Sequence, residues 1–142
     1  MSITKEFSSK LHKANDSLAK KTIINSWVGK FKSIVENTDK YGPDLIAEDN
    51  KGLKFFIEVE IKHNWNIDKF PFDSLHIPKR KQKFLKYGRI IFIVISKNLK
   101  WGLIVKGTDL KDTLLQEVEN KYISGGEEFY RVPMNLCKRI IL

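Results

Sequence analysis

The sequence predicts an α/β fold in which helices flank a central mixed β-sheet. Residues 53–62 alternate between apolar and polar side chains, as in a strand that buries one face. Residues 89–96 (RIIFIVIS) are almost continuously apolar, which indicates a strand buried on both faces in the middle of a sheet. Segments with helical spacing lie before, between and after the predicted strands, so the predicted order of elements is αββαββα.

The first part of the chain predicts a helix followed by a β-hairpin. Asp16 or Ser17 caps a helix over residues 17–31, in which apolar side chains recur at helical spacing. The segment NTDKYGPD then ends the helix. The hairpin consists of a first arm, a turn and a second arm, predicted at residues 44–48, 49–52 and 53–62.

The second part of the chain begins with an irregular segment, HNWNIDKFPFDSLHIP, which leads into a basic helix, KRKQKFLKYG. The irregular segment mixes aromatic, asparagine and histidine residues, as expected of a DNA-reading loop or of a cover for the sheet edge. The remaining predicted elements are a strand at 100–107, a helix at about 109–121 and terminal strands at 128–132 and 138–142.

The length of the chain indicates the number of domains, and its charge indicates the kind of partner. The chain has 142 residues, which predicts a single domain over residues 1–142. It carries 26 Lys and Arg against 17 Asp and Glu, a net charge of +9. Such an excess favours nucleic acid as the partner, because each neutralised phosphate releases counterions. The alternative is that the lysine-rich composition has no functional meaning.

Composition also predicts where the protein works. The single cysteine, Cys137, fits a reducing cytoplasm, and no apolar run has the length of a signal peptide or a membrane span. We therefore expect a cytoplasmic protein with no membrane partner. No glycine-rich phosphate-binding loop is present, so we expect no nucleotide cofactor.

Two carboxylates and an ammonium lie along one face of the strand at 53–62. Side chains on a strand alternate sides, so Glu58, Glu60 and Lys62 share the face opposite the apolar residues. Same-face neighbours lie about 7 Å apart. Burying carboxylates without partners is costly, and a divalent cation or a cluster of lysines would offset their repulsion.

Asp44 joins this face if the hairpin turn has three residues. A turn at 50–52 with Gly52 in the left-handed conformation is a common hairpin closure. It places Asp44 opposite Glu58 and diagonal to Glu60. A two-residue turn would shift the register by one and send Asp44 to the other face. The functional interpretation therefore depends on the turn.

Asp44, Glu60 and Lys62 in this arrangement predict metal-assisted hydrolysis of phosphodiesters. Mg²⁺ prefers hard oxygen ligands and retains several waters. It polarises a phosphoryl group and lowers the pKa of a bound water. A lysine ammonium nearby orients the water and offsets charge that develops on the phosphate. We therefore expect Mg²⁺ as the cofactor, with Mn²⁺ as a substitute.

The segment GPDLIAEDNKGLKFFIEVEIK resembles the PD-(D/E)xK nuclease superfamily. Pro43-Asp44 matches the PD element, and Glu60-Ile61-Lys62 matches the (D/E)xK element after fifteen intervening residues. The resemblance implies a restriction-endonuclease-like fold with an αβββαβ-type core. It also implies that Asp44, Glu60 and the Ile61 carbonyl hold Mg²⁺ and that Lys62 is the catalytic lysine.

Two further glutamates are candidate catalytic residues. Members of the superfamily often add a glutamate from the first helix, and Glu36 is the nearest candidate for that position. Glu58 is the rival for a second metal or for positioning water, because it shares the strand face with Glu60.

The basic segment is the predicted nucleic-acid interface. On a helix, Lys79, Lys83 and Lys86 lie on one stripe, and the Arg80 guanidinium suits a bidentate phosphate contact. A solvated charged face is the alternative. The expected DNA-binding residues are Lys79, Arg80, Lys81, Lys83 and Lys86.

These observations predict a Mg²⁺-dependent DNA endonuclease, most similar to the small homing-type, restriction-type or phage-encoded enzymes. Double-stranded DNA is the expected substrate. Cutting of both strands with one site per chain predicts a homodimer or higher homo-oligomer. A four-way-junction resolvase and a non-catalytic DNA-binding protein that retains the fold are the alternatives.

Overall fold

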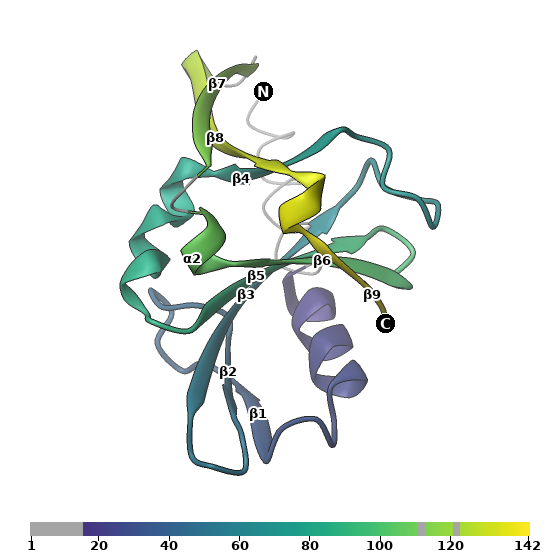
Figure 1. Cartoon of the computed structure of the whole chain (residues 1–142), viewed down its shortest axis with the longest axis vertical. Coiled ribbons are helices and arrows are strands. Elements are labelled where there is room, and N and C mark those ends of the chain that lie inside the picture. The colour runs from purple at the N-terminus through teal and green to yellow at the C-terminus, as the bar shows by residue number, and fades with distance from the viewer. Residues whose placement is uncertain (1–15, 111–112, 121–122) are drawn as a thin grey trace, which may run out of the picture.

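The computed structural model describes residues 16–110, 113–120 and 123–142, in which nine strands form two sheets (Figure 1). The larger sheet has the order β1-β2-β3-β5-β6-β9, with bounds Ser33–Glu36, Leu45–Glu48, Lys54–Lys62, Ile90–Ser96, Trp101–Lys106 and Lys138–Ile141. The smaller sheet has the order β4-β8-β7, with bounds Ser74–Pro78, Ile123–Pro133 and Leu114–Asn120. The described chain is therefore mixed α and β, as predicted.

The helices of the described residues are few and short. The described part of the N-terminal helix covers residues 16–26. The others are η1 (Lys79–Lys86, a 3₁₀ helix), α2 (Gly107–Leu110) and η2 (Met134–Leu136, also 3₁₀). None of the helices in these ranges is long and apolar enough to cross a membrane.

The strand β5 is the centre of the larger sheet. It runs parallel to β3 and antiparallel to β6, which makes the sheet mixed. Its residues are almost all buried, because layers of structure cover both faces of the sheet. The prediction of a central, doubly buried strand from the apolar run is confirmed.

Two different layers cover the two faces of the larger sheet (Figure 1). On one face the N-terminal helix packs its apolar side on the sheet, and the buried residues are Ala19, Ile23, Trp27, Leu45, Ala47, Ile57, Val59, Ile93 and Ile95. On the other face the cover is the β4-β8-β7 sheet with η1 and α2, and the buried residues include Leu75, Ile77, Phe84, Phe92, Val94, Val105, Leu110, Tyr130 and Val132. The prediction of helices on both sides is therefore wrong for the second face, where a small sheet forms most of the layer.

The hairpin between β2 and β3 has the predicted register. Gly52 is left-handed, with a φ of 82°. The Asp49 N–H donates to the Leu53 carbonyl at 3.0 Å, and the Asp49 carboxylate accepts the N–H groups of Lys51 and Leu53, both at 2.9 Å. Leu45 lies opposite Ile57, so the next residue outward, Asp44, faces Glu58. The three-residue turn is confirmed.

The helix predicted at 109–121 is wrong. Helix α2 ends at Leu110. The Leu110 carbonyl accepts two hydrogen bonds from Thr113, one from its backbone N–H at 3.1 Å and one from its hydroxyl at 2.8 Å. The chain then continues as β7, which pairs antiparallel with β8. Pairing between segments distant in sequence overrides the local helical pattern here, as is common for short amphipathic stretches.

Other parts of the predicted secondary structure also need correction. The N-terminal helix ends at residue 26 rather than 31, and left-handed Gly29, with a φ of 89°, redirects the chain behind it. The basic segment forms a 3₁₀ helix instead of an α-helix. Strand β1 was not predicted, and β4 lies inside the segment expected to be irregular. Both extra strands are short and depend on a partner strand for their hydrogen bonds.

Substitution of Gly52 tests the turn. We expect Gly52→Ala to lower the free energy of unfolding by about 1 kcal/mol, because a side chain disfavours the left-handed conformation. Gly88→Ala is the matched control, since no atom lies within 4 Å of its added Cβ and its φ is not left-handed. Urea denaturation of both variants measures the difference. Equal stability of the two variants would contradict the role given to the turn.

Candidate active site

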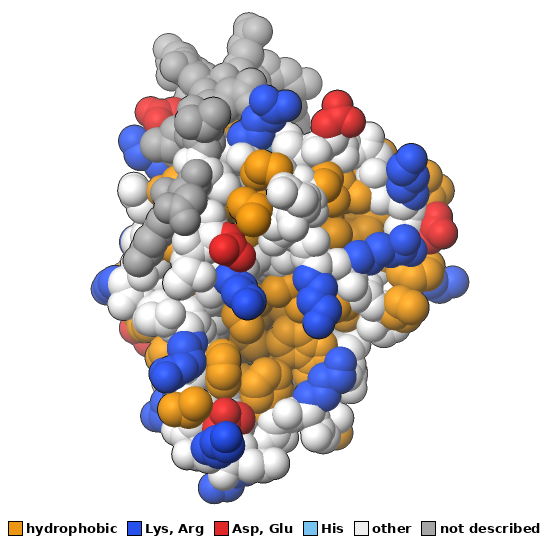
Figure 2. Space-filling view, in the orientation of Figure 1, with side chains coloured by type: hydrophobic (Ala, Val, Ile, Leu, Met, Phe, Trp, Pro, Cys, Tyr) orange, Lys and Arg blue, Asp and Glu red, His pale blue; other side chains and the backbone are white. Residues whose placement is uncertain are grey.

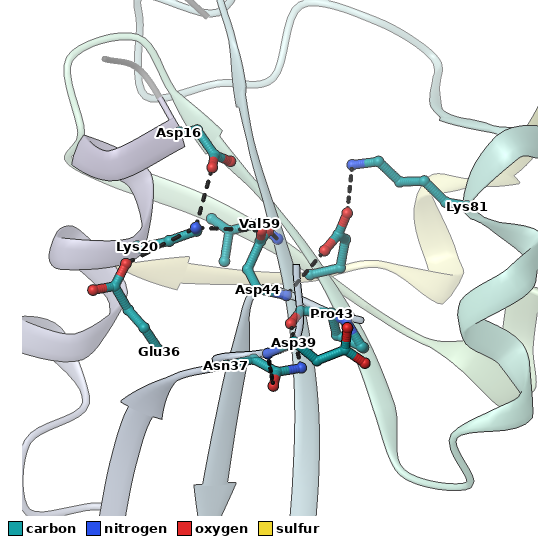
Figure 3. A network of polar contacts seen from close by, with 10 residues as sticks. Asp16, Lys20, Glu36, Asn37, Asp39, Pro43, Asp44, Val59 and Lys81 are labelled. Atoms are coloured by element: carbon teal, nitrogen blue, oxygen red, sulfur yellow. Dashed lines mark hydrogen bonds and ion pairs between the residues drawn. The ribbon is translucent and has the colours of Figure 1, made fainter. Parts of the chain in front are cut away.

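The loop before β2 places Asp44 directly at the start of this strand, beside β3 (Figure 3). The Asn37 side chain donates to the Pro43 carbonyl at 3.0 Å, and the Asn37 N–H donates to the Asp44 carbonyl at 2.9 Å. A Cβ at Gly42 would lie 2.6 Å from the Asn37 amide nitrogen, so a larger residue there would displace the Asn37 side chain from its present position. The Gly-Pro-Asp sequence is therefore folded back on Asn37, and Asp44 enters β2 in a fixed position.

Asp44 extends the hairpin with its side chain. The last paired residues of β2 and β3 are Leu45 and Ile57. Two residues further along β3, the Val59 N–H donates to the Asp44 carboxylate at 2.9 Å. In return the Asp44 N–H donates to a Glu58 carboxylate oxygen at 3.1 Å. These two hydrogen bonds hold the carboxyl groups of Asp44 and Glu58 side by side at the point where the two strands separate.

Lys81 approaches the same pair from η1 on the opposite side (Figure 3). Its Nζ lies 3.6 Å from a Glu58 oxygen and 3.2 Å from a Glu60 oxygen. The side chains of Lys81 and Glu58 are only 12 % and 11 % exposed, so this ion pair is largely shielded from water. Lys81 was predicted as a DNA-binding residue on a solvent-facing helix, and its ammonium instead lies between two carboxylates of the site.

Burial determines the charge state of the carboxyl pair. It raises the pKa of Glu58 to about 8, and the neighbouring Asp44 carboxyl adds to the increase while Lys81 opposes it. Burial also raises the pKa of Asp44, although the hydrogen bond from Val59 favours the ionised form. Both groups therefore have a cost of ionisation that a proton or a bound cation offsets.

A second lysine, Lys20, contacts Asp44 from the N-terminal helix (Figure 3). Lys20 Nζ lies 3.2 Å from Asp16, 3.9 Å from Glu36 and 3.9 Å from Asp44. Glu36 lies on β1 and not on the first helix. It therefore does not occupy the position of the helix glutamate that the family resemblance implied. The acidic residue that the helix does bring toward Asp44 is Asp16. Its spacing of four residues from Lys20 indicates an ion pair along the helix, whereas its place beside Asp44 depends on how the helix packs on the sheet.

The other predicted site residues lie in different places. Lys62 shares the strand with Glu60, but its Nζ lies over the ring of Phe72, 5.4 Å from the centroid. Lys79 pairs with Glu128 at 3.4 Å. Lys83 and Lys86 lie over the rings of their neighbours Phe84 and Tyr87. Of the five predicted DNA-binding residues, Arg80 and Lys81 are the two that line the cavity at the site.

This cavity has a volume of about 270 Å³. Its lining combines acidic groups from β3 and the helix with basic groups from η1 and the chain after β3: Asp16, Ala19, Glu58, Val59, Glu60, Ile61, His63, Arg80 and Lys81. The acidic and basic groups thus line one open cavity. A phosphate with a bound metal ion would place the metal near the acidic groups and the phosphate near the basic groups.

The carboxyl groups near the cavity supply oxygen donors, the kind of ligand that Mg²⁺ takes. Within the described residues, no group of three or more His, Cys, Asp or Glu side chains lies close enough to hold a metal ion by itself. The available donors are the Asp44 and Glu58 carboxylates, with Glu60 further along the strand. Mg²⁺ is commonly held by one or two carboxylates, several waters and a substrate phosphate, whereas structural Zn²⁺ and Ca²⁺ sites use more protein ligands.

Comparison with protein-family models and with curated proteins found no match to this chain. The fold and the site geometry therefore carry the functional argument.

The raised pKa of Glu58 predicts a pH-dependent stability. Between pH 4.5 and about 8 the folded protein retains the Glu58 proton that the unfolded chain releases. The free energy of unfolding of the wild type should therefore fall as pH rises through this window, with a slope of at most ~1.4 kcal/mol per pH unit from this group. Glu58→Gln has no carboxyl group to titrate at this position. Its free energy of unfolding should therefore rise relative to that of the wild type as the pH approaches 8. Urea denaturation in EDTA measures both curves, and a difference that does not change with pH would contradict the assignment.

Proposed function

We propose that the protein is a Mg²⁺-dependent DNA endonuclease of the PD-(D/E)xK type, with a restriction-endonuclease-like fold. The observation that carries this proposal is the pair of buried carboxyls, Asp44 and Glu58, held together at the end of a hairpin with the Lys81 ammonium beside them. The mixed sheet, with β3 and β5 parallel and a helix on one face, supports the same fold assignment.

The carboxylates would hold the metal. Asp44 and Glu58 are held together by a hydrogen bond, and Glu60 and Ile61, which line the cavity with Glu58, would complete the set with a carboxylate and a backbone carbonyl. A bound Mg²⁺ supplies polarisation of the phosphate and a lowered pKa for water, and Mn²⁺ substitutes for it. Neutralisation of the pair also explains why a protein would keep two carboxyls where burial makes their ionisation costly.

Lys81 is the ammonium that we assign to the reaction. The resemblance in sequence gives this role to Lys62, but the Lys81 Nζ is the one within 3.6 Å of both Glu58 and Glu60. In the reaction, water adds to phosphorus and the bond from phosphorus to a bridging oxygen breaks, so one DNA end carries phosphate and the other a hydroxyl. Lys81 would donate to a non-bridging phosphate oxygen, where negative charge grows.

The rest of the chain fits a DNA substrate. The net charge of +9 favours a polyanion, and Arg80 adds a guanidinium to the wall of the cavity, where it suits a phosphate. Because each chain has one such site, we propose that a homodimer or higher oligomer cuts the two strands of a duplex.

Three lysine variants test the site with plasmid DNA and Mg²⁺. We expect Lys81→Ala to lower the cleavage rate by about 10²- to 10³-fold, as for the loss of one donor to a developing oxyanion. Lys62→Ala should lower the rate less than Lys81→Ala does. Lys51→Ala, which removes the same charge from the exposed hairpin turn, should cleave like the wild type.

Asp44→Asn should abolish cleavage, as should EDTA with the wild type, because both remove the means of holding the metal. No cleavage of plasmid, linear duplex or a synthetic four-way junction by the wild type in Mg²⁺ or Mn²⁺ would contradict the nuclease and favour the non-catalytic DNA-binding alternative. A larger loss in Lys62→Ala than in Lys81→Ala would return the catalytic role to Lys62.

A further inference from the structure

A second cavity, of about 410 Å³, lies beside the segment that connects β3 to β4. Its lining is mostly aromatic and aliphatic, with charged groups among them: Trp65, Phe70, Phe72, Leu103, Met134 and Cys137, and then Lys69, Asp73 and Arg139. On the face shown in Figure 2, hydrophobic side chains lie among Lys and Arg side chains over this part of the molecule, at the upper right. A mostly apolar hollow with a few charged groups is the usual form of a binding site for a small, flat ligand.

The aromatic residues form a chain of rings from the core to the surface. Trp65 is fully buried, Phe70 is 8 % exposed and Phe72 is 43 % exposed. Phe70 makes edge-on contacts with both neighbours, at 5.2 Å to Trp65 and 5.4 Å to Phe72. Phe72 is thus held in place by its edge contact and keeps ring surface open to solvent. In addition, the Trp65 indole N–H is buried without an acceptor in the described part of the chain, which is unusual for a buried tryptophan.

One cation lies over the exposed ring, and a second lines the same cavity. Lys62 Nζ lies 5.4 Å from the centre of the Phe72 ring. The Arg139 guanidinium lies over Trp101 and pairs with Asp68 at 3.8 Å, in side chains that are 48 % and 66 % exposed. Exposed ion pairs contribute little to stability, so a phosphate can replace Asp68 on Arg139 at small cost. An aromatic platform with nearby cations is the combination that binds single-stranded nucleic acid.

The cavity lies close to the proposed active site along the same strand. Lys62, whose ammonium lies over Phe72, follows Glu60 by two residues on β3. Same-face neighbours on a strand are about 7 Å apart. A DNA strand held at the carboxylates would therefore pass Phe72 within a short distance of the bond that is cut.

We propose that this cavity binds an unstacked nucleobase, with Phe72 as the stacking platform and with Lys62 and Arg139 as phosphate contacts. The bases of an uninterrupted duplex cover one another's faces, so only an unpaired nucleotide can stack on a side chain. The substrate class is then DNA with an unpaired nucleotide near the cut, as at branches, gaps or bulges. This inference rests on the proposed nuclease function, and it favours a structure-selective enzyme over a sequence-specific one.

Equilibrium binding in EDTA tests the proposal without any cleavage. The probes are a labelled duplex, the same duplex with one extra unpaired nucleotide, and a third in which that nucleotide lacks its base. We expect the wild type to bind the second DNA about 5- to 150-fold more tightly than the other two, the equivalent of ~1–3 kcal/mol for one stacked base. Phe72→Ala should lose this preference and keep its affinity for the perfect duplex. Phe72→Trp should retain the preference.

Ile67→Ala is the matched control, because Ile67 is an exposed apolar residue of the same segment, 60 % exposed, outside the cavity lining. It should keep the preference. Equal binding of all three DNAs by the wild type, binding of none, or a preference that persists in Phe72→Ala would overturn the proposal. So would loss of self-association in Phe72→Ala without any DNA preference, which would assign the cavity to a second copy of the chain. Since no metal or turnover is involved, the outcome is independent of whether the nuclease assay succeeds.

Discussion

The hydrogen bond from the Val59 N–H to the Asp44 carboxylate is the contact on which the candidate site depends. It replaces the next backbone bond of the β2–β3 ladder with a side-chain bond, so the carboxyl of Asp44 is fixed against the strand that carries Glu58 and Glu60. The contact requires the hairpin register, which the left-handed Gly52 sets at one end. It also requires the folded loop before β2, which positions Asp44 at the other end.

The carboxyls of the site are balanced from two sides by lysines from different parts of the fold. Lys20, from the N-terminal helix, contacts Asp44, and Lys81, from η1, contacts Glu58 and Glu60. Each lysine is partly or largely buried and comes from an element that packs on a different layer. A metal ion that neutralises the carboxyls would weaken the attraction between Lys81 and the two glutamates. The Lys81 ammonium would then be available to bind a phosphate. In the proposed enzyme, a lysine that contacts carboxyl groups in the free protein thus becomes a substrate contact.

The sequence predicted those parts of the structure that local chemistry determines. The register of the hairpin follows from turn residues adjacent to it, and the central position of β5 follows from its continuous apolar run. The helix at 109–121 was wrong because pairing of β7 with β8, which is not local, decides that segment. Lys81 was assigned to DNA because the basic run comes after the strand that carries Glu60, a position suited to flank the scissile phosphate. Which lysine of the run turns inward depends on the 3₁₀ geometry of η1 and on how η1 packs against β3, and neither is visible in the spacing.

If Asp44 and Glu58 form a site for a divalent cation, the protein should bind Mn²⁺ in the absence of DNA. Isothermal titration calorimetry of the wild type and of the double variant Asp44→Asn/Glu58→Gln, without DNA, separates cation binding from catalysis. We expect saturable binding by the wild type and none by the double variant, whose two carboxamides keep the shape of the pair and remove its charge. Equal binding by both proteins, or no binding by the wild type, would contradict it.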